Sequence, residues 1–318
     1  MSDGERIEHV LGSRWRVTGV PQQRALGLRV EVSEQGGGPA LTAMVVSPTV
    51  VAMMRDPKIF AQALEGLAPA PGAARVAEAR WSGGNLYYVL SAGSSHSAAS
   101  HVVDGFSAVS KAEVVRIGAL AADALETLHA QGRTHGALTS TDVLTGPDEE
   151  HARLLNAGVA AALVAAGVPR ERVPMLLDAR SYLSPEGLAG APATPRDDVY
   201  ALGAVLYEML TGRPPFGGRM TSHTMAAVLA ETDEGPVFEA GRPAPGDGAT
   251  DVVLRAIEKA PDDRWPTARD FARALRGGVA HTPPNPMATV PDRAHVKPGC
   301  LPALLAIAGT GAGLWWMV

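Results

Sequence analysis

The sequence predicts an α+β fold in which a small β-rich lobe precedes a larger helical lobe. Between residues 15 and 46, short runs of β-branched residues are separated by turn residues, a pattern typical of antiparallel strands. From residue 112 onward, apolar residues recur at helical spacing. Residues 198–210 are almost entirely apolar, so we expect them to form a helix buried at the centre of the helical lobe.

Length and composition set broad limits on the function. The chain has 318 residues, which allows one large two-lobed domain and a tail, and 46% of them are hydrophobic. The net charge of −5 gives no reason to expect nucleic-acid binding. The single cysteine, Cys300, excludes an internal disulfide framework. The polar N-terminus carries no signal peptide, so we expect the main body to lie in the cytoplasm.

The first lobe is expected to contain four strands, with a helix before the last of them. The strands are predicted over Trp15–Val20, Leu26–Val32, Leu41–Val46 and Leu86–Leu90. Residues 50–66 have helical composition, and Pro69–Gly72 then breaks the chain. Residues 112–131 carry apolar side chains along one stripe, which predicts the first long helix of the second lobe.

The central helix, residues 198–210, has clear signals at both ends. Only Glu208 interrupts its apolar run. Asp197 or Asp198 is expected to cap its first N–H groups, and Gly212 is expected to take the left-handed position that ends it. It is too short to span a membrane.

Three stretches resemble conserved parts of the protein kinase family. Residues Asp197–Gly218, which read DDVYALGAVLYEMLTGRPPFGG, resemble the long helix of the kinase C-lobe, above all that of bacterial eukaryotic-like Ser/Thr kinases. Tyr182–Glu186 and Asp262–Leu275 resemble the SPE motif and the final helical region. The resemblance implies a bilobal protein-kinase-like fold with an N-lobe over about 10–92 and a C-lobe over about 93–276, together the domain 10–276.

Residues that hold the kinase fold are present. The resemblance implies a buried ion pair between Glu186 and Arg264, and a bond from Asp198 to the backbone of the catalytic loop. His135 matches a position in the packing spine of the family and need not be catalytic.

Residues that bind phosphate in kinases are replaced. The phosphate-loop pattern G-x-G-x-x-G-x-V aligns best with Gly19, Pro21, Arg24 and Leu26. Proline offers no N–H and arginine adds bulk, so we interpret the segment as an ordinary β-turn, although Gly19 stays a candidate cofactor-binding residue. The lysine of the V-A-I-K strand falls on Met44, which would fill space rather than bind phosphate. Glu65 is a loosely aligned candidate for the glutamate that pairs with this lysine.

The catalytic loop, Thr134–Thr145, also lacks its chemistry. The replacements are Gly136 for arginine, Ala137 for the general-base aspartate, Thr139 for lysine and Asp142 for the metal-binding asparagine. Alanine cannot accept the proton of a substrate hydroxyl. Asn156 stands where the D-F-G aspartate would hold Mg²⁺. In Asp142 and Asn156 the asparagine and aspartate of the family pattern have exchanged places. The two residues form either a weak site for Mg²⁺ and ATP, or a site whose residues have changed because catalysis no longer requires them.

The activation segment, about Val159–Leu183, lacks the usual phosphorylation acceptor; Ser181 and Tyr182 remain in it, and Tyr182 matches a structural position of the family. Between Val159 and Arg180 there is no Ser, Thr or Tyr, and the usual threonine aligns with Ala179. Phosphorylation has no acceptor there that could add charge and order the segment.

The C-terminal part differs from the rest. Residues 277–300 are rich in proline and predict a linker. Residues 301–318 carry no charge and are just long enough to cross a bilayer as a helix. Arg293 and Lys297 favour a cytoplasmic N-terminal side. The alternative is a helix that docks on another protein. Cys300 is either a palmitoylation site or an incidental cysteine.

Three functions fit this sequence. We favour a membrane-tethered pseudokinase on the cytoplasmic face of the inner membrane, with a single C-terminal anchor. It would be a binding or scaffold module in bacterial Ser/Thr signalling, with active kinases or their substrates as partners, no nucleic acid, and no required cofactor. The alternative enzyme is an atypical Ser/Thr kinase that uses Asp142 and Asn156 for its metal. A tail-anchored adaptor whose groove binds a peptide or another ligand is the third.

Overall fold

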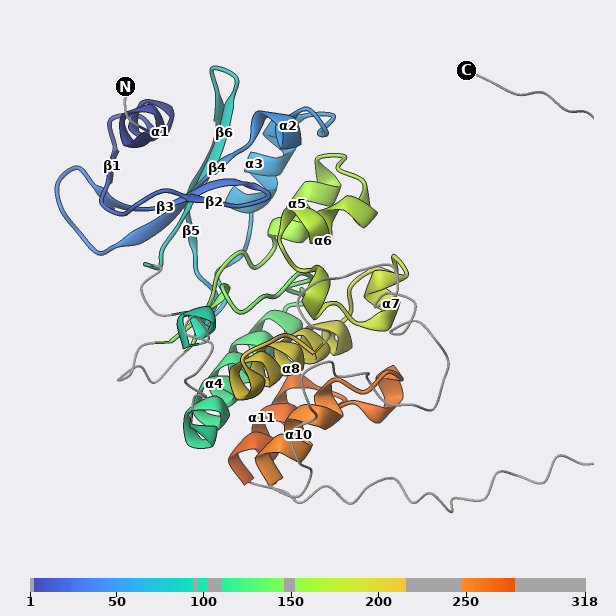
Figure 1. Ribbon diagram of the computed structural model, residues 1–318. Helices are drawn as coiled ribbons and strands as arrows, with labels where there is room; N and C mark the ends of the chain where they lie inside the picture. Colours follow the sequence, from blue (N-terminus) through green and yellow to red (C-terminus); the bar gives the residue numbers. More distant parts are fainter. Residues whose placement is uncertain (1–2, 94–96, 102–109, 146–151, 216–247, 278–318) are drawn as a thin grey trace, which may run out of the picture. The chain divides into compact units, whose positions relative to one another are not determined.

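A computed structural model describes residues 3–93, 97–101, 110–145, 152–215 and 248–277 (Figure 1). Residues 1–281 form one compact unit, and its described residues make a β-rich N-lobe and a helical C-lobe. The predicted bilobal fold is therefore confirmed. In these ranges no helix is both long and apolar enough to cross a membrane. The predicted membrane helix, 301–318, lies outside the described residues.

A six-stranded antiparallel sheet forms the N-lobe. Strands β1, β3, β4, β6 and β5 are neighbours in that order, and β2 pairs with β3. The strands are β1 (Trp15–Val17), β2 (Gln22–Gln23), β3 (Gly27–Glu34), β4 (Leu41–Val46), β5 (Val76–Ser82) and β6 (Asn85–Leu90). One face of the sheet packs against helix α1 (Asp3–Leu11). Ile7 and Leu11 of this helix form a buried cluster with Trp15.

The strand predictions were correct in position but incomplete. The first predicted strand stops at Val17, because the chain leaves the β1 pairing before Val20. Strand β5 was missed because it is an edge strand whose side chains are mostly exposed or half-buried, which hides its pattern. The helix predicted over 50–66 is two helices, α2 (Pro48–Val51) and α3 (Pro57–Glu65). Asp56 caps α3 and Pro57 takes its first position, so the break is built into the sequence.

The C-lobe consists of helices around one central helix. Its helices are α4 (Lys111–His129), α5 (Val159–Ala165), α6 (Val173–Leu176), α7 (Pro185–Leu188), α8 (Pro195–Thr211), α10 (Gly248–Ala256) and α11 (Ala268–Gly277). Two short strands, β7 (Val143–Leu144) and β8 (Arg153–Leu154), pair antiparallel. Helices α4, α10 and α11 all contact α8, and α4 and α11 also pack directly against each other (Figure 1).

Helix α8 is buried on all sides, as its composition predicted, but its N-cap was predicted wrongly. The cap is Thr194, three residues before Asp197, and the two form a capping box in which each side chain binds the backbone N–H of the other. Pro195 takes the first helical position. Asp197 and Asp198 lie inside the first turn, where the helix dipole favours negative charge. Gly212 ends the helix at φ 77°, as predicted.

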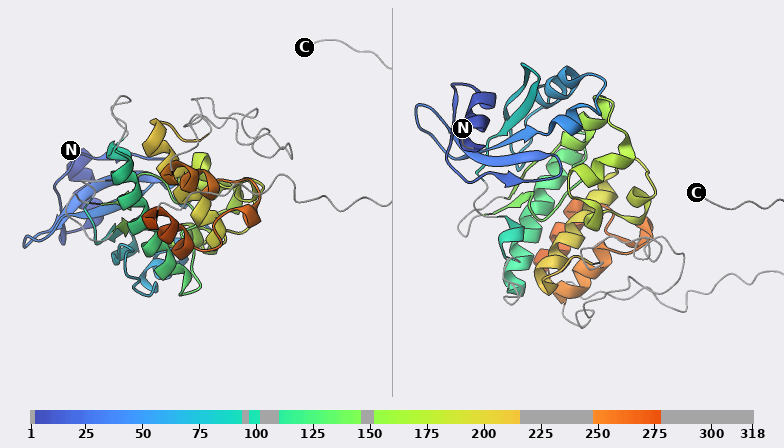
Figure 2. Two further views of the ribbon diagram at one scale, coloured as in Figure 1. Left: turned by 90° about the horizontal axis from the view of Figure 1, so that it is seen from below. Right: turned by 45° about the horizontal axis from the view of Figure 1, so that its top comes forward.

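The start of the activation segment packs as part of the core. Buried side chains of α5 and α6 share one apolar cluster with α3 and with the cleft-facing side of the N-lobe sheet. Helix α5 lies beside α3 in Figure 1 and in the right-hand view of Figure 2. The cluster therefore fastens the two lobes together through the segment that kinases usually leave free to switch.

The expected ion pair between Glu186 and Arg264 is present. Two parallel bonds of 2.6 and 2.8 Å join the guanidinium of Arg264 to the two carboxylate oxygens of Glu186. The Arg264 side chain is fully buried and also donates to the carbonyls of Glu258 and Lys259, whereas the Glu186 side chain keeps 27% of its surface exposed. The guanidinium lies 4.8 Å from the centre of the Tyr200 ring on α8. The pair thus ties α7 and the chain before α11 to the central helix.

Removal of either partner is expected to destabilise the C-lobe by about 3–5 kcal/mol, because the other charge stays in a largely desolvated place. Denaturant unfolding of Glu186→Ala, Arg264→Ala and the double variant measures this, and the double variant should lose less than the sum of the two. Asp262→Ala is the control, since Asp262 belongs to an exposed pair with Arg196. Single variants as stable as the wild type would show that the pair contributes nothing.

Candidate functional site

The catalytic-loop segment is held by one buried carboxylate. Asp198, 1% exposed, accepts hydrogen bonds from the backbone N–H of His135 at 2.8 Å and of Gly136 at 2.9 Å. Its Oδ2 also lies 2.9 Å from Nε2 of His129 at the end of α4. Three elements, α4, α8 and the loop, therefore meet at Asp198. Ala137 follows this anchor and is itself buried, so no carboxylate stands at the position of the general base.

A second set of hydrogen bonds holds the catalytic loop at Ser140. Tyr182 donates to Oε2 of Glu208 at 2.7 Å, and its hydroxyl lies 3.0 Å from that of Ser140. Burial raises the pKa of Glu208, and the bonds from Tyr182 and Ser140 oppose that rise. Glu208, the only interruption of the apolar helix, thus serves to hold Tyr182 and the loop.

The carboxylate of Asp142 is occupied by its own neighbours. Its Oδ2 accepts from the backbone N–H of Thr139 at 3.0 Å and from the hydroxyl of Thr139 at 2.7 Å. Its Oδ1 accepts from Nδ2 of Asn156 at 2.8 Å. The structure therefore brings Thr139, Asp142 and Asn156 together, as the sequence predicted for the last two, and it joins them directly to one another.

Asn156 continues this network into the N-lobe. Its Oδ1 accepts from the hydroxyl of Tyr88 on β6 at 2.8 Å. Its backbone is left-handed, with φ 55°, a conformation that asparagine adopts more readily than most residues. Burial and the nearby carboxylate of Asp142 raise the pKa of Tyr88, which keeps the hydroxyl protonated as a donor. The chain Thr139–Asp142–Asn156–Tyr88 thus links the catalytic loop to the sheet through neutral donors.

The face of the sheet that binds phosphate in the kinase pattern carries a row of three buried side chains here. Met44 on β4 pairs in register with Arg29 on β3 and with Tyr88 on β6. Arg29, 7% exposed, reaches down to the carbonyl of Thr141, 3.4 Å from its Nη1. Burial lowers the pKa of Arg29, and the charge of Asp142 opposes that effect.

Sequence reasoning missed Arg29, although a signal for it was present. Once β3 and β4 are aligned, Arg29 stands directly across from Met44, the position that lacks its lysine. A charged residue on the cleft-facing side of a strand that is buried on both sides would have indicated a cation in the cleft. The cleft therefore keeps a positive side chain, Arg29, but on the neighbouring strand.

The segment aligned with the phosphate loop is a tight hairpin. Arg24 and Gly27 exchange two backbone hydrogen bonds, 2.8 and 3.1 Å long, around two central residues. Gly19 lies outside this turn, and its N–H donates to the carbonyl of Glu31 at 3.2 Å. Whether Gly19 contacts a cofactor stays a prediction. The glycine that the hairpin needs is Gly27, at φ 158°, since a Cβ there would lie 2.0 Å from the carbonyl oxygen of Val45.

The pairing role considered for Glu65 does not hold in this structure. Glu65 is exposed at the end of α3 and makes no hydrogen bond or ion pair with the described residues. The face of α3 toward the sheet is apolar, and its Phe60 packs against Tyr88 with ring centres 5.9 Å apart. Within the described ranges no cluster of three or more His, Cys, Asp or Glu side chains could hold a metal ion.

Comparisons with known proteins place this chain in a family. The protein kinase domain matches residues 72–272. The serine/threonine-protein kinase PkaA of Streptomyces coelicolor is 37% identical over 158 residues, which cover 49% of this chain and 27% of that kinase. The serine/threonine-protein kinase PknB of Mycolicibacterium smegmatis is 33% identical over 162 residues, 51% of this chain and 25% of that kinase. The chain thus spans about a quarter of the length of these relatives.

A solved structure shows the same fold over a longer range. The kinase domain of Mycobacterium tuberculosis PknI superposes with a TM-score of 0.56 and 22% identity, covering 84% of this chain and 97% of that domain. The family domain matches more than half of the chain, and the bilobal fold and the motifs of the C-lobe agree with it. The chain belongs to the protein kinase domain family, and its relatives include bacterial Ser/Thr protein kinases.

Proposed function

We propose that this chain is a pseudokinase, a binding or scaffold module in bacterial Ser/Thr kinase signalling that does not transfer phosphate. The observation that carries the proposal is the network at Asp142. Its two carboxylate oxygens accept three hydrogen bonds from Thr139 and Asn156, so the group that would hold a metal is already satisfied by the protein.

Protein kinases generally use ATP and Mg²⁺, and the residues here do not fit that pair of ligands. Magnesium requires hard oxygen ligands in octahedral geometry, usually including carboxylates. Asp142 is the one carboxylate at this site among the described residues, and the carbonyl oxygen of the Asn156 side chain is taken by Tyr88. Met44 supplies no charge, and Ala137 supplies no base.

The space beneath the sheet is lined by apolar side chains. Leu26 of the hairpin, Met44, Tyr88 and Leu144 of β7 all belong to one buried cluster. Dispersion contacts among such side chains stabilise a closed cleft without any ligand. Arg29 adds a polar contact across the same cleft through the carbonyl of Thr141. The protein can therefore keep its two lobes together without nucleotide.

One observation favours the alternative of an atypical active kinase. Nδ2 of Asn156 lies 2.8 Å from Oδ1 of Asp142. The guanidinium of Arg29 lies close enough to Asp142 for that carboxylate to raise the pKa of Arg29. A nucleotide that displaced the Asn156 contact would meet one carboxylate, one amide and one guanidinium. This alternative still requires another group in place of Ala137 to orient the attacking hydroxyl.

A phosphotransfer assay separates the two functions. The full-length protein, given γ-labelled ATP with Mg²⁺ or Mn²⁺ and generic protein substrates, should transfer no more label than a heat-inactivated sample. An active bacterial Ser/Thr kinase run in parallel serves as the positive control. Label above background that disappears in Asp142→Ala would overturn the pseudokinase proposal and establish the atypical enzyme.

The network can be tested apart from activity with Asn156→Asp. The new carboxylate would replace the donor of a 2.8 Å bond, so two like charges would face each other and raise the pKa of one of them. An acid whose pKa is raised by folding loses stability as the pH increases. We therefore expect a melting temperature several degrees below that of the wild type, with a gap that widens from pH 5 to pH 8.

The matched control is the double variant Asp142→Asn with Asn156→Asp. It restores one amide and one carboxylate in the exchanged order, so it should recover most of the lost stability. Added Mg²⁺ should also narrow the gap in the single variant, because a cation between the carboxylates relieves their repulsion. Equal melting temperatures for Asn156→Asp and wild type at both pH values would mean that the network does not form.

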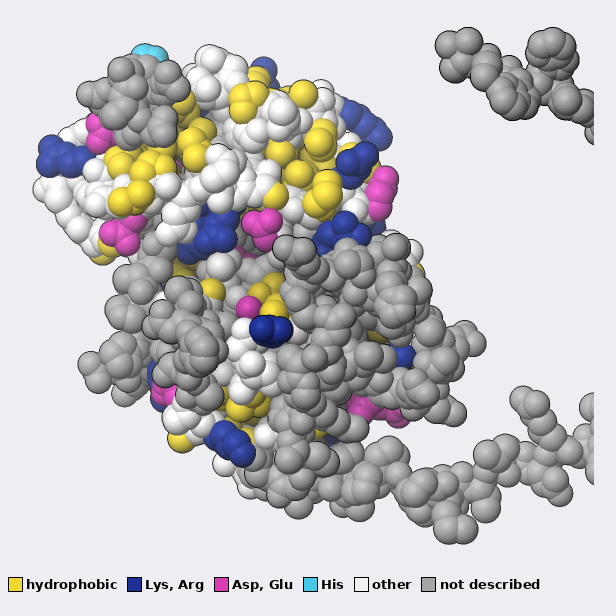
Figure 3. Space-filling view, in the orientation of Figure 1, with side chains coloured by type: hydrophobic (Ala, Val, Ile, Leu, Met, Phe, Trp, Pro, Cys, Tyr) yellow, Lys and Arg dark blue, Asp and Glu magenta, His cyan; other side chains and the backbone are white. Residues whose placement is uncertain are grey.

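The proposal includes a membrane anchor and signalling partners. The uncharged stretch 301–318 after the linker 277–300 supports a single C-terminal anchor, with the kinase-like body at the cytoplasmic face of the inner membrane. The proposed partners are other signalling proteins, including active Ser/Thr kinases or their substrates. In the view of Figure 3, acidic and basic side chains are interspersed over the described surface, which does not favour nucleic acid as a ligand.

Fractionation of cells tests the anchor. Full-length protein should remain in the membrane pellet after washes with high salt and carbonate, since a helix in lipid is not removed by either. A version that ends at Val296 should appear in the soluble fraction. Full-length protein in the soluble fraction, or the shortened version in the pellet, would contradict the anchor at 301–318.

A further inference from the structure

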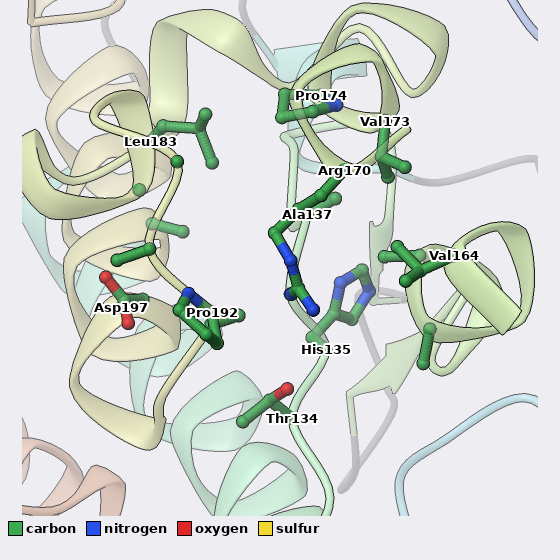
Figure 4. Close-up of a pocket in the computed structure, with 18 of the residues that line it drawn as sticks. Thr134, His135, Ala137, Val164, Arg170, Val173, Pro174, Leu183, Pro192 and Asp197 are labelled. Carbon is green, nitrogen blue, oxygen red and sulfur yellow. The ribbon is translucent and has the colours of Figure 1, made fainter. Parts of the chain in front are cut away.

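A groove of about 630 Å³ lies between helix α4 and the chain that precedes β5. Its walls come from residues 69–75, from the second half of α4, from Ser91 after β6 and from the start of β8. We call it the α4 groove. It shares no residue with the Asp142 network, nor with the apolar pocket around His135 and Ala137 that Figure 4 shows. The α4 groove therefore lies apart from both halves of the catalytic region.

One wall of the α4 groove, residues 69–75, is fastened to α4. The hydroxyl of Thr127 donates to the carbonyl of Pro71 at 2.5 Å. Gly72, at φ 80°, lies so close to the helix that a Cβ on it would stand 2.5 Å from the Cβ of Ala124. Only glycine permits this approach. The wall is therefore in place before a ligand arrives, which lowers the entropic cost of binding.

The floor of the α4 groove is apolar. It is lined mainly by alanine and proline side chains, and Leu120 of α4 is the largest apolar side chain in it. Leu120 is half-buried, so a ligand can reach it. An aliphatic group placed on Leu120 would remove apolar surface of both partners from water, which is favourable.

Hydrogen-bond donors meet in this groove at Ser91. Its Oγ accepts from the backbone N–H of Arg75 at 2.9 Å, and its carbonyl oxygen lies 3.4 Å from Nη1 of Arg153. The O–H of Ser91 and the guanidinium of Arg75 donate to none of the described residues. Both arginines are exposed, and neither forms an ion pair within the described ranges. Two guanidiniums and a hydroxyl are therefore free to turn toward an anion.

The acidic groups near the α4 groove do not cancel these cations. Of the described residues that line it, Asp123 is the one with a carboxylate, and both its oxygens bond to the guanidinium of Arg276 on α11. Glu65 and Arg75 both line a second, smaller pocket, but no ion pair joins them. The charge that remains in the groove is positive, so it is complementary to an acidic ligand.

We propose that the α4 groove binds an extended acidic segment of a partner protein, in which carboxylates flank an aliphatic side chain. The carboxylates pair with Arg75 and Arg153 and accept from the O–H of Ser91, and the aliphatic side chain covers Leu120. A guanidinium suits this role because its fork of N–H groups matches a carboxylate. The groove is open to solvent along one side, whereas pockets for small molecules enclose most of their ligand. An extended peptide therefore fits it better than a small molecule.

This inference gives the proposed binding module a class of partner. It does not rest on the absence of phosphate transfer, since the α4 groove and the Asp142 network share no residue. Phosphate transfer in the assay above would leave it standing, and lack of peptide binding would leave the pseudokinase proposal standing.

Isothermal titration calorimetry of the full-length protein in non-ionic detergent tests the proposal. The probe is the peptide GSEDLVEDSG, acetylated and amidated so that its ends carry no charge, and saturable binding is expected. The analogue GSQNLVQNSG lacks the carboxylates, and GSEDSSEDSG lacks the aliphatic side chains. Each should bind at least about tenfold more weakly, since one loses charge-assisted hydrogen bonds and the other loses apolar burial. Added salt should weaken the first peptide, because exposed ion pairs are screened.

Variants of the protein locate the site. Arg75→Gln with Arg153→Gln should weaken GSEDLVEDSG about tenfold, since each exposed ion pair contributes about threefold in affinity and the two effects combine. Both residues are exposed, so this double variant should fold normally, which thermal unfolding checks. Leu120→Ser should weaken GSEDLVEDSG and leave GSEDSSEDSG unchanged, whereas a loss of fold would weaken both peptides.

The matched control is Arg170→Gln with Arg172→Gln. It removes the same charge from two exposed arginines that line the pocket of Figure 4 and have no partner among the described residues. It should bind GSEDLVEDSG within about twofold of the wild type, and a tenfold loss would place the peptide in that pocket instead.

The competing occupant is the acidic stretch 148–150, which precedes Arg153 in the chain and lies outside the described residues. Changing it to Asp148→Asn, Glu149→Gln and Glu150→Gln should raise the affinity for GSEDLVEDSG less than about tenfold. A larger gain would show that this stretch fills the groove, and would overturn the proposal. It is also overturned by absence of saturable binding up to about 1 mM peptide, or by the Arg75 and Arg153 double variant binding within about twofold of the wild type.

Discussion

The structure depends on the hydrogen bonds that the buried carboxylate of Asp198 accepts. This carboxylate joins the N-terminal turn of the central helix to two backbone N–H groups of the catalytic loop and to His129 at the end of α4. A buried charge is tolerated only when its oxygens are satisfied, so the loop must adopt the path that presents those N–H groups. The loop of this kinase-family member is therefore held in place independently of any catalytic side chain that it carries.

The replaced residues divide the region of the kinase active site into two unlike halves. On the side of the sheet, Met44, Tyr88 and Leu144 lie in one buried cluster, and the Asp142 network satisfies the remaining polar groups internally. On the side of the missing base, Gly136 and Ala137 leave a cavity. Among the described residues, the side where kinases generally hold nucleotide is thus largely buried, whereas the other side lines a pocket.

The activation segment follows the same principle. Its first part contains no hydroxyl that could be phosphorylated and is rich in alanine, valine and leucine, so it forms α5 and packs into the cluster shared with α3 and the sheet. A segment that contributes buried apolar area to both lobes is held by the hydrophobic effect rather than by added charge. Its composition and its packing therefore favour one stable arrangement of this segment.

The sequence by itself determined the fold, because the fold is indicated by local patterns of apolar residues, by residues at helix ends and by long motif matches. The apolar run of α8 and the Gly212 terminus are visible in the chain, and the resemblance to kinase motifs named Glu186 and Arg264 as partners. Tertiary structure alone decided which residues fill the site. Arg29 came to stand beside Met44 through strand register, Tyr88 met Asn156 across the lobes, and the pocket at His135 arose from small side chains far apart in sequence. Such contacts depend on the packing of distant segments, which no local pattern in the chain specifies.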